Sequence, residues 1–349
     1  MNPDYILKKV TDLTLYTGNN GRAKCSCNCP GCTQTNYGNR NSSSRHQGTL
    51  PQIEEIIEIL PNLLNAYFLG NPDCSVDTTF CRDSAKLFIR NGKNVMFSTS
   101  GIGGLDTFKV LFDDIDISCV KYVSFSINSM NGDTERLLKG GNIDLKTVLQ
   151  GIEYCLMLNI PVKIQPTLWQ INQYDYKDII NFFYSMYHIN WYTFHCGSLE
   201  GIPNNYSRLC HHIKPDVWTS IISDLTQIGI EKNLQMQIPQ IFLEETDYHA
   251  YLKEYKNYCM YGGVGAQIWM EKELKCTFCP MLGEIYPDIF SFNPTFATEI
   301  KFTNSNICPI TKFLLGKDLA NEFSSGKWIS ETGNIFYPVC RFYSQKINL

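Results

Sequence analysis

Strand-like and helix-like stretches alternate from about residue 12 to about residue 232, and this alternation constrains the fold more than any other feature. The strand-like stretches are short and rich in aromatic or β-branched residues, and they span 13–17, 66–69, 94–99, 121–127, 161–168 and 191–195. Apolar residues recur at helical spacing in the stretches between them, among them 51–64, 145–158, 174–187 and 214–228. Successive βα units predict an α/β fold, a parallel sheet curled into a partial (β/α)6 TIM-like barrel with helices outside. Functional residues are then expected at the carboxyl ends of the strands.

Four cysteines follow the first predicted strand within eight residues, in the segment Cys25-Ser26-Cys27-Asn28-Cys29-Pro30-Gly31-Cys32. Cys25, Cys29 and Cys32 have the spacing C-x3-C-x2-C, whereas a triad that starts at Cys27 would need a cysteine where Gly31 stands. Three thiolates can hold three irons of a 4Fe-4S cubane and leave the fourth iron open to a ligand from outside the protein. A zinc site made by Cys25 or Cys27 with Cys29, Cys32 and a remote His or Cys remains an alternative.

Composition excludes several classes of partner. The net charge of -4 over 349 residues gives no basic signal for nucleic acid. The chain begins without a secretion signal, and no apolar run approaches the ~20 residues of a membrane span, so we expect a cytoplasmic protein with no membrane partner. Fifteen cysteines in such a chain favour metal and thiol chemistry over disulfides. Isolated cysteines such as Cys119 and Cys155 are expected to be small buried hydrophobic residues.

The alternation breaks down after about residue 235. The remainder is rich in Gly, Pro and aromatic residues and contains Cys259, Cys276, Cys279, Cys308 and Cys340. We interpret residues 1–235 as the barrel and residues 236–349 as a small loop-rich extension organised around a metal centre rather than a hydrophobic core. The spacing Cys276-x2-Cys279 is also compatible with zinc.

Four of the predicted strands end in recognisable segments: Phe68-Leu69-Gly70-Asn71-Pro72, Thr99-Ser100-Gly101, Ser124-Phe125-Ser126-Ile127-Asn128-Ser129, and Lys163-Ile164-Gln165-Pro166-Thr167-Leu168 followed by Asn172. They are similar, in order, to the G-G-E-P loop, the T-N-G segment, the S-x-D-S segment and the polar strand of the radical S-adenosylmethionine (SAM) superfamily. Together with the cysteine triad, these segments make roughly the first 200 residues resemble that superfamily.

The resemblance implies the cofactors. The 4Fe-4S cluster on Cys25, Cys29 and Cys32 would bind SAM at its open iron and, once reduced by a flavodoxin or ferredoxin, cleave it to a 5′-deoxyadenosyl radical. The implied SAM-binding residues are Gly70, Asn71, Pro72, Thr99, Ser126 and Asn128. The family usually has an aromatic residue where Gly31 stands, so adenine stacking is assigned instead to Tyr37. The first Gly and the Glu of the G-G-E-P loop are also replaced, by Leu69 and Asn71.

The extension resembles the auxiliary-cluster domains of the family, SPASM and the shorter Twitch, although the longer cysteine run of SPASM is absent. The resemblance implies a second 4Fe-4S cluster held by Cys259, Cys276, Cys279 and one of Cys308 or Cys340. The sequence does not choose between the last two, and zinc remains the alternative at this site.

The sixth predicted strand ends in His195 and Cys196, and Glu200 follows. Because side chains alternate along a strand, one of His195 and Cys196 faces the barrel interior and the other faces the helices. Cys196 is a candidate hydrogen-atom donor and Glu200 a candidate general base, with plain packing and helix capping as the alternatives.

Three functions follow from these interpretations. The favoured one is a radical SAM enzyme that abstracts a hydrogen atom to modify a ribosomally synthesised peptide. The second is a radical SAM dehydrogenase, decarboxylase or epimerase that acts on a sugar, nucleoside or amino acid. The third is a zinc-stabilised binding module without catalysis. The sequence does not identify the substrate.

Overall fold

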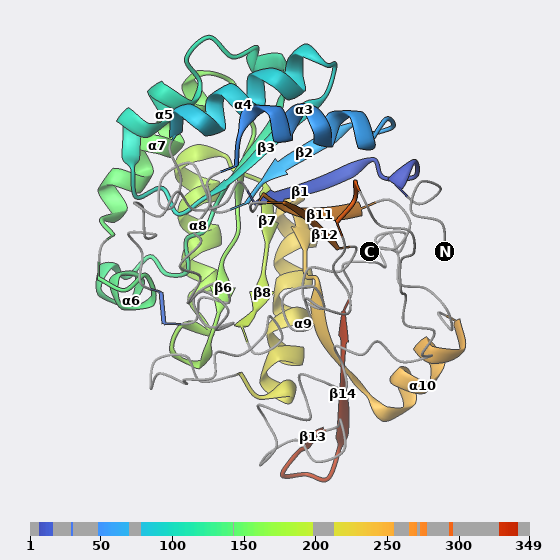
Figure 1. The fold of residues 1–349 in the computed structure, drawn as a ribbon. Coiled ribbons are helices and arrows are strands. Elements are labelled where there is room, and N and C mark those ends of the chain that lie inside the picture. The colour runs from blue at the N-terminus through green and yellow to red at the C-terminus, as the bar shows by residue number, and fades with distance from the viewer. Residues whose placement is uncertain are drawn as a thin grey trace.

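The computed structural model describes residues 7–16, 29–30, 48–69, 78–141, 143–197, 213–254, 265–270, 273–277, 293–295 and 328–340. Within these residues the largest sheet has the strand order β12-β11-β1-β2-β3-β4-β5-β7-β9 (Figure 1). Neighbouring strands from β11 to β9 are parallel, and β12 runs antiparallel to β11. The strands are β1 (Asp12–Tyr16), β2 (Asn65–Phe68), β3 (Asn94–Thr99), β4 (Val120–Phe125), β5 (Val162–Ile164), β7 (Trp191–Thr193), β9 (Gln235–Gln237), β11 (Gly265–Met270) and β12 (Leu274–Thr277).

Helices connect these strands and cover the outer face of the curved sheet, as the α/β prediction requires (Figure 1). They are α3 (Leu50–Ile59), α4 (Thr78–Arg90), α5 (Gly104–Leu111), α6 (Gly132–Leu138), α7 (Leu145–Met157), α8 (Tyr176–Tyr187) and α9 (Pro215–Lys232), with the short 3-10 helices η1 (Ile117–Cys119) and η2 (Gln170–Asn172). The predicted TIM-like partial barrel is confirmed.

Local sequence explains where several helices begin and end. The side chain of Asn131 accepts hydrogen bonds from the first backbone N–H groups of α6, and Asp144 does the same for α7. Helix α3 ends at Ile59, shorter than predicted, because a residue that precedes a proline disfavours the helical conformation and Pro61 follows. Helix α9 continues four residues beyond the predicted end and stops at Asn233, which has φ 51°.

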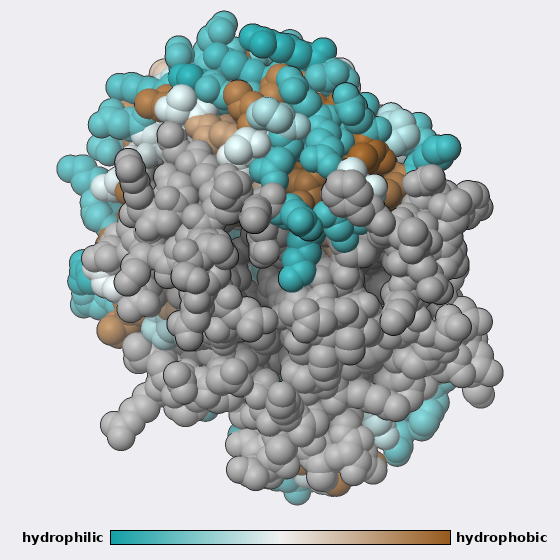
Figure 2. Space-filling model, viewed as in Figure 1, coloured by the Kyte–Doolittle hydropathy of each residue, from teal (hydrophilic) through white to brown (hydrophobic). Residues whose placement is uncertain are grey.

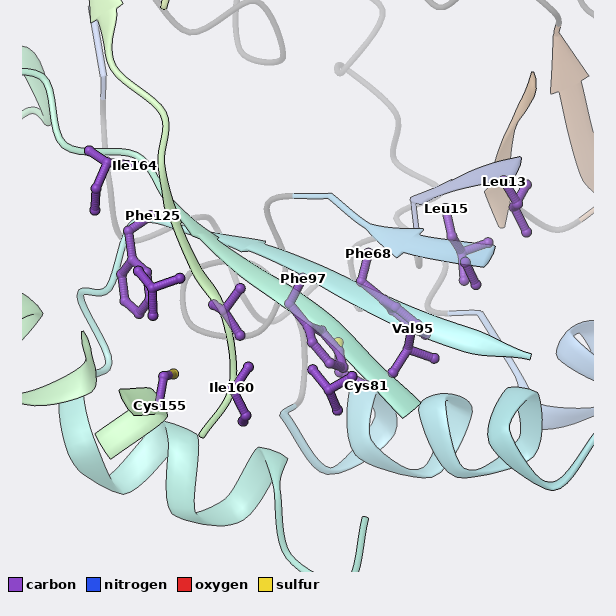
Figure 3. Packing of buried hydrophobic residues seen from close by; sticks show 14 of the residues in the cluster. Leu13, Leu15, Phe68, Cys81, Val95, Phe97, Phe125, Cys155, Ile160 and Ile164 are labelled. Atoms are coloured by element: carbon purple, nitrogen blue, oxygen red, sulfur yellow. The ribbon is translucent and has the colours of Figure 1, made fainter. Parts of the chain in front are cut away.

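Aromatic and aliphatic side chains fill the layer between sheet and helices (Figure 3). Phe68 of β2 packs edge-on against Phe88 of α4 with ring centroids 6.0 Å apart, and Phe125 of β4 lies 5.4 Å from Phe108 of α5. Burial of each such ring contributes about 1.5–3 kcal/mol. Cys155 belongs to this core, as expected, whereas the expectation for Cys119 is wrong, because it is partly exposed on η1 beside Asp116.

The hairpin β11–β12 comes from the predicted extension, yet it completes the barrel sheet. β11 pairs in parallel with β1, so that Leu15 lies opposite Ile268, and the hairpin residues Ala266, Ile268, Met270, Leu274 and Cys276 are buried in the main core. The interpretation of this region as one without a hydrophobic core is therefore wrong for the hairpin. The apolar alternation in β11 is the physical reason, because it lets one face of the strand join the helix-facing layer.

Strand β9 was not expected, and it places the predicted domain boundary after residue 235 inside a strand of the barrel sheet. Its sequence Gln235-Met236-Gln237 is polar and carries no strand signal of its own. Pairing with β7 decides its conformation. The division of the chain into two domains stays a prediction.

A smaller antiparallel sheet follows the barrel strands, with the order β10-β14-β13. It consists of β10 (Gln240–Glu244), β14 (Ile335–Cys340) and β13 (Trp328–Ile329), and α10 (Glu245–Glu254) packs beside it. The rings of Tyr248 and Tyr337 stack with centroids 4.2 Å apart, and Ile241 joins them in a separate apolar cluster. This part of the extension thus has its own small core.

The described outer surface is mostly hydrophilic where α3, α4 and α5 lie, with scattered apolar residues (Figure 2). No helix among the described residues has both the length and the apolar character required to cross a bilayer.

Candidate functional site

The carboxyl ends of the parallel strands, that of β1 included, meet at one edge of the sheet. Strand alternation assigns side chains to the interior or to the helix layer. Phe125 packs on α5 and Phe194 packs on Tyr176 of α8, so Ser124 and His195 lie on the opposite side, which is the barrel interior. The candidate site is built from this interior and from the strand ends above it.

Thr99 ends β3 and is 1% exposed. Its hydroxyl accepts a hydrogen bond from the backbone N–H of Gly101 at 2.9 Å, and its carbonyl accepts one from the backbone N–H of Ser126 at 2.8 Å. Gly101 has φ 77°, and a Cβ there would lie 2.7 Å from Val148 of α7, so only glycine fits. Thr99 stands two residues after Phe97 in the strand, so its side chain points to the same face, toward the helices. The backbone of the strand end is then the part that faces the interior.

Ser126 shares the interior parity of Ser124 and follows β4 directly. Its hydroxyl accepts a hydrogen bond from the ammonium of Lys139 at 2.7 Å. Lys139 follows α6 and is 4% exposed, so this cation is held at the end of β4 in a largely dry position. The strand end therefore presents a hydroxyl and a positive charge together.

Asn128 is buried and links the end of β4 to the segment after β5. Its side-chain oxygen accepts a hydrogen bond from the backbone N–H of Thr167 at 2.8 Å, and its carbonyl accepts one from the amide of Asn172 at 2.8 Å. The backbone N–H groups of Asn128 and Ser129 both donate to one carboxylate oxygen of Glu135, at 2.9 and 3.0 Å. These bonds fix the loop, because a charged acceptor strengthens hydrogen bonds in a buried position.

A chain of polar side chains crosses the interior between β4, β5 and β7. The hydroxyl of Ser124 donates to the side-chain oxygen of Gln165 at 2.7 Å, and the amide nitrogen of Gln165 lies 2.8 Å from Nε2 of His195. In this orientation the amide donates, so Nε2 of His195 is the acceptor. Strands β6 (Thr167–Leu168) and β8 (His195–Cys196) pair above this level and hold His195 in place.

His195 thus faces the interior, and Cys196 lies on the helix side, fully buried in the hydrophobic core. Cys196 packs as a small apolar residue in that position. Its predicted role as hydrogen-atom donor stays a prediction, and among the described residues of this strand end His195 is the polar side chain inside the barrel.

Lys163 lies one interior position deeper than Gln165 on β5, opposite Ser124 of β4. Its ammonium is 4.4 Å from the ring centroid of Tyr122 and 5.4 Å from that of Trp191. Burial lowers the pKa of Lys163 to about 8, because the charged form loses its hydration. Burial likewise raises the pKa of Tyr122, with smaller contributions from Tyr67 and Asp12.

Sequence reasoning assigned no role to Lys163 or Lys139. For Lys163 a signal was present, because a lysine that alternates with Val162 and Ile164 in a strand must point away from the helix layer. For Lys139 no local pattern predicts that a charged residue after a short helix turns back to a strand end. Its contact with Ser126 depends on tertiary structure.

The predicted metal ligands are only partly within the described residues. Cys29 is partly buried in the segment 29–30, Cys276 is buried in β12 opposite Ile268, and Cys340 ends β14 opposite Gln240. Burial raises the pKa of the Cys276 thiol. The described residues contain no group of three or more His, Cys, Asp or Glu side chains that could hold a metal ion. The other predicted site residues lie outside the described residues: Cys25, Cys32, Tyr37, Gly70, Asn71, Pro72, Glu200, Cys259, Cys279 and Cys308.

No family model matches the chain, and no curated protein matches it by sequence. Solved structures match it by fold. SuiB of Streptococcus suis bound to S-adenosylmethionine aligns with a TM-score of 0.58 at 12% identity, over 81% of this chain and 63% of SuiB. The chain thus shares the fold of this S-adenosylmethionine-bound structure. SuiB bound to the precursor peptide SuiA aligns with a TM-score of 0.56 at 12% identity, over 81% of this chain and 62% of that one.

A further fold match is native anSMEcpe with bound AdoMet and a Cp18Cys peptide, with a TM-score of 0.53 at 12% identity over 90% of this chain and 82% of the other. The chain spans less than two thirds of the SuiB chain. Ser126 and Lys139 place a hydroxyl and a cation together at the end of β4, groups that can bind a carboxylate.

Proposed function

We propose that this chain is a radical SAM enzyme that cleaves SAM reductively and uses the 5′-deoxyadenosyl radical to abstract a hydrogen atom from its substrate. One observation carries the proposal: 81% and 90% of the chain follow the fold of two structures solved with bound SAM, and the C-x3-C-x2-C triad stands in the loop after the first barrel strand. The fold comparison and the spacing of the cysteines are independent of each other.

The chain's residues then have distinct tasks. Cys25, Cys29 and Cys32 hold the 4Fe-4S cluster, which when bound and reduced supplies the electron for cleavage of the sulfonium. Ser126 and Lys139 bind polar groups of SAM at the end of β4, and the ammonium favours its carboxylate. The pinned loop around Asn128 keeps that strand end rigid, so that cofactor and substrate are held in one geometry.

For the substrate we propose a ribosomally synthesised peptide. Support comes from the two fold matches, since one SuiB structure contains its precursor peptide SuiA and the anSMEcpe structure contains a Cp18Cys peptide. A short precursor reading frame beside the gene would add support. If the enzyme turned over a free small metabolite at about 1 per second or faster, an ordinary enzymatic rate, the peptide proposal would be wrong and that metabolite would be the substrate.

The test of the cofactor chemistry is anaerobic reconstitution with iron and sulfide, followed by reduction in the presence of SAM. We expect 5′-deoxyadenosine from the wild type and its loss, by at least about 100-fold, in Cys29→Ala, because a cubane with two protein ligands does not retain the site-differentiated iron. Cys119→Ala is the matched control, since Cys119 lies on η1 and is not a predicted ligand. Bound zinc without iron, or undiminished product from Cys29→Ala, would contradict the proposal.

A further inference from the structure

Lys163 is a buried cation in the interior of the barrel, 6% exposed, on a strand whose neighbouring residues Val162 and Ile164 face the helices. Its ammonium lies among three aromatic rings from three strands: Tyr122 at 4.4 Å, Trp191 at 5.4 Å and Tyr67 at 6.0 Å from the ring centroids. The rings of Tyr122 and Trp191 meet edge to face with centroids 4.7 Å apart, which fixes the shape of this cage.

The cage leaves hydrogen-bond donors without acceptors. Among the described residues, the ammonium of Lys163 makes no hydrogen bond or ion pair, although it has three N–H donors. The hydroxyl of Tyr67 is also buried and has no partner that meets hydrogen-bond geometry, although the hydroxyls of Ser98 and Ser124 lie close enough to lower its pKa in part. Burial raises the pKa of Tyr67, which keeps this hydroxyl protonated and therefore a donor. A buried hydroxyl without an acceptor is uncommon in proteins, and here it lies in the same interior as the ammonium of Lys163.

We propose that Lys163 and the Tyr67 hydroxyl form a carboxylate-binding site inside the barrel, which takes an acidic group of the substrate. The assignment of that group to the substrate rests on the proposed function, whereas the binding of a carboxylate does not. A carboxylate has two oxygen acceptors and one negative charge, so it satisfies both donors and neutralises the buried cation at once.

The surroundings favour an anion that enters from the strand ends. Ser124 lies opposite Lys163 and is linked through Gln165 to His195 nearer the strand ends, so polar side chains line the interior between the strand ends and the cage. Asp12 of β1 is close enough to raise the pKa of Tyr122, but its carboxylate accepts hydrogen bonds from Asn65 and Thr11. Asp175 and Glu135 have their own partners, Ser129 and the loop at Asn128, at the strand ends. The interior thus supplies the cation but no resident counter-ion among the described residues.

The test uses thermal unfolding of the full chain in sodium acetate, with sodium chloride at equal ionic strength and acetamide as the uncharged analogue. We expect acetate to raise the Tm of the wild type and of Lys163→Arg, and to need at least tenfold higher concentration for the same effect in Lys163→Met. Tyr67→Phe should weaken the response less than that. Lys232→Met is the matched control, because Lys232 lies 4.9 Å from the ring centroid of Tyr184 on the helices. An equal response of wild type and Lys163→Met, or of acetate and acetamide, would overturn the site.

Two further measurements keep the proposal open to refutation if Lys163→Met folds poorly. In the wild type alone, the half-saturating acetate concentration should be constant at lower pH and rise up to tenfold per pH unit above the pKa of Lys163, near pH 8, because the neutral amine does not attract an anion. A pH-independent response would count against the site. A blocked peptide Ac-Gly-Glu-Gly-NH2 should stabilise the protein where its Gln counterpart does not. None of these measurements requires SAM cleavage, so failure of the cluster chemistry leaves them interpretable.

Discussion

The ammonium of Lys163 is buried in the barrel, where it contacts aromatic rings instead of water. Cation–π contacts with Tyr122 and Trp191 are worth about 0.5–2 kcal/mol, whereas burial lowers the pKa of Lys163 because the charged form loses its hydration. A buried cation without a counter-ion lowers the stability of the folded protein. Such groups occur most often at sites that bind a ligand.

This residue yields a prediction for stability against pH. The pKa of Lys163 is about 8 in the folded protein against 10.5 for a free lysine, so between these values the unfolded chain binds more protons and stability rises with pH. Relative to Lys163→Met, the free energy of unfolding of the wild type should therefore increase by about 2–3 kcal/mol from pH 7 to pH 10. Urea unfolding of both proteins at both pH values measures it. A difference that stays constant over this window would show that the charge is not desolvated.

The structure places Thr99, Ser126 and Asn128, three of the predicted site residues, at the same edge of the sheet, because each stands at or just after the end of a predicted strand. The sequence did not show which of His195 and Cys196 faces the interior. Alternation says that the two side chains point to opposite faces of the strand, but not which face is the inner one. The hydrogen bond between Gln165 and His195 shows that His195 is the one that faces inward. The roles of these residues toward SAM and substrate stay predictions.

The elements of the site are held by side chains that belong to loops. Asn172 of η2 donates to the carbonyls of Asn128 and Thr167 and accepts from the backbone N–H of Trp169, so one fully buried amide joins the end of β4 to the turn after β5. Three backbone groups have the Asn172 amide as a hydrogen-bond partner. Because Asn172 is fully buried, water cannot take the place of the amide unless the loops rearrange.

We predict that Asn172→Ala lowers the free energy of unfolding by about 2–4 kcal/mol, because it removes three hydrogen bonds and leaves buried backbone groups without partners. Asn91→Ala is the control, since the Asn91 amide also binds a backbone carbonyl, that of Leu87, but in an exposed position. Its cost should stay below about 1 kcal/mol. Urea unfolding compares the two, and equal costs would mean that the loops do not depend on the buried amide.

Element prediction from periodicity was accurate for the parallel strands up to β4 and for α7 and α8, which carry strong apolar patterns. The predicted strand 161–168 divides into β5 and β6 because Pro166 lies between them and has no N–H to donate to the sheet. β9 has no pattern of its own, so its conformation could be obtained only from its pairing with β7.

At the scale of the whole molecule, the extension contributes both to the barrel and to the small sheet of β10, β13 and β14. Cys276 lies in the first of these parts and Cys340 in the second. The sequence predicted the cysteine-rich character of the region but not that its hairpin would pair with β1, because parallel pairing across most of a chain leaves no local signal.

The auxiliary cluster remains a prediction at this scale. Anaerobically reconstituted protein should contain about eight irons per chain, as two cubanes require, and replacement of Cys276 and Cys279 together by alanine should reduce this to about four. Iron and zinc determination on both proteins measures it, with Cys119→Ala as the control. About four irons in the wild type, unchanged in the double variant, would contradict a second cluster, and one zinc per chain would assign the site to that metal.

The pairing of β1 with β11 also sets the order of events during synthesis. At ~5–20 residues per second, the roughly 250 residues between Leu15 and Ile268 take roughly 12–50 s to emerge from the ribosome. During that interval the outer edge of β1 has no β11 beside it, and an uncovered edge is the part of a sheet that pairs with foreign chains. The edge of β1 therefore stays exposed until the residues of β11 have been synthesised. We expect the yield of folded protein in the cell to depend on how well chaperones shield this edge during that interval.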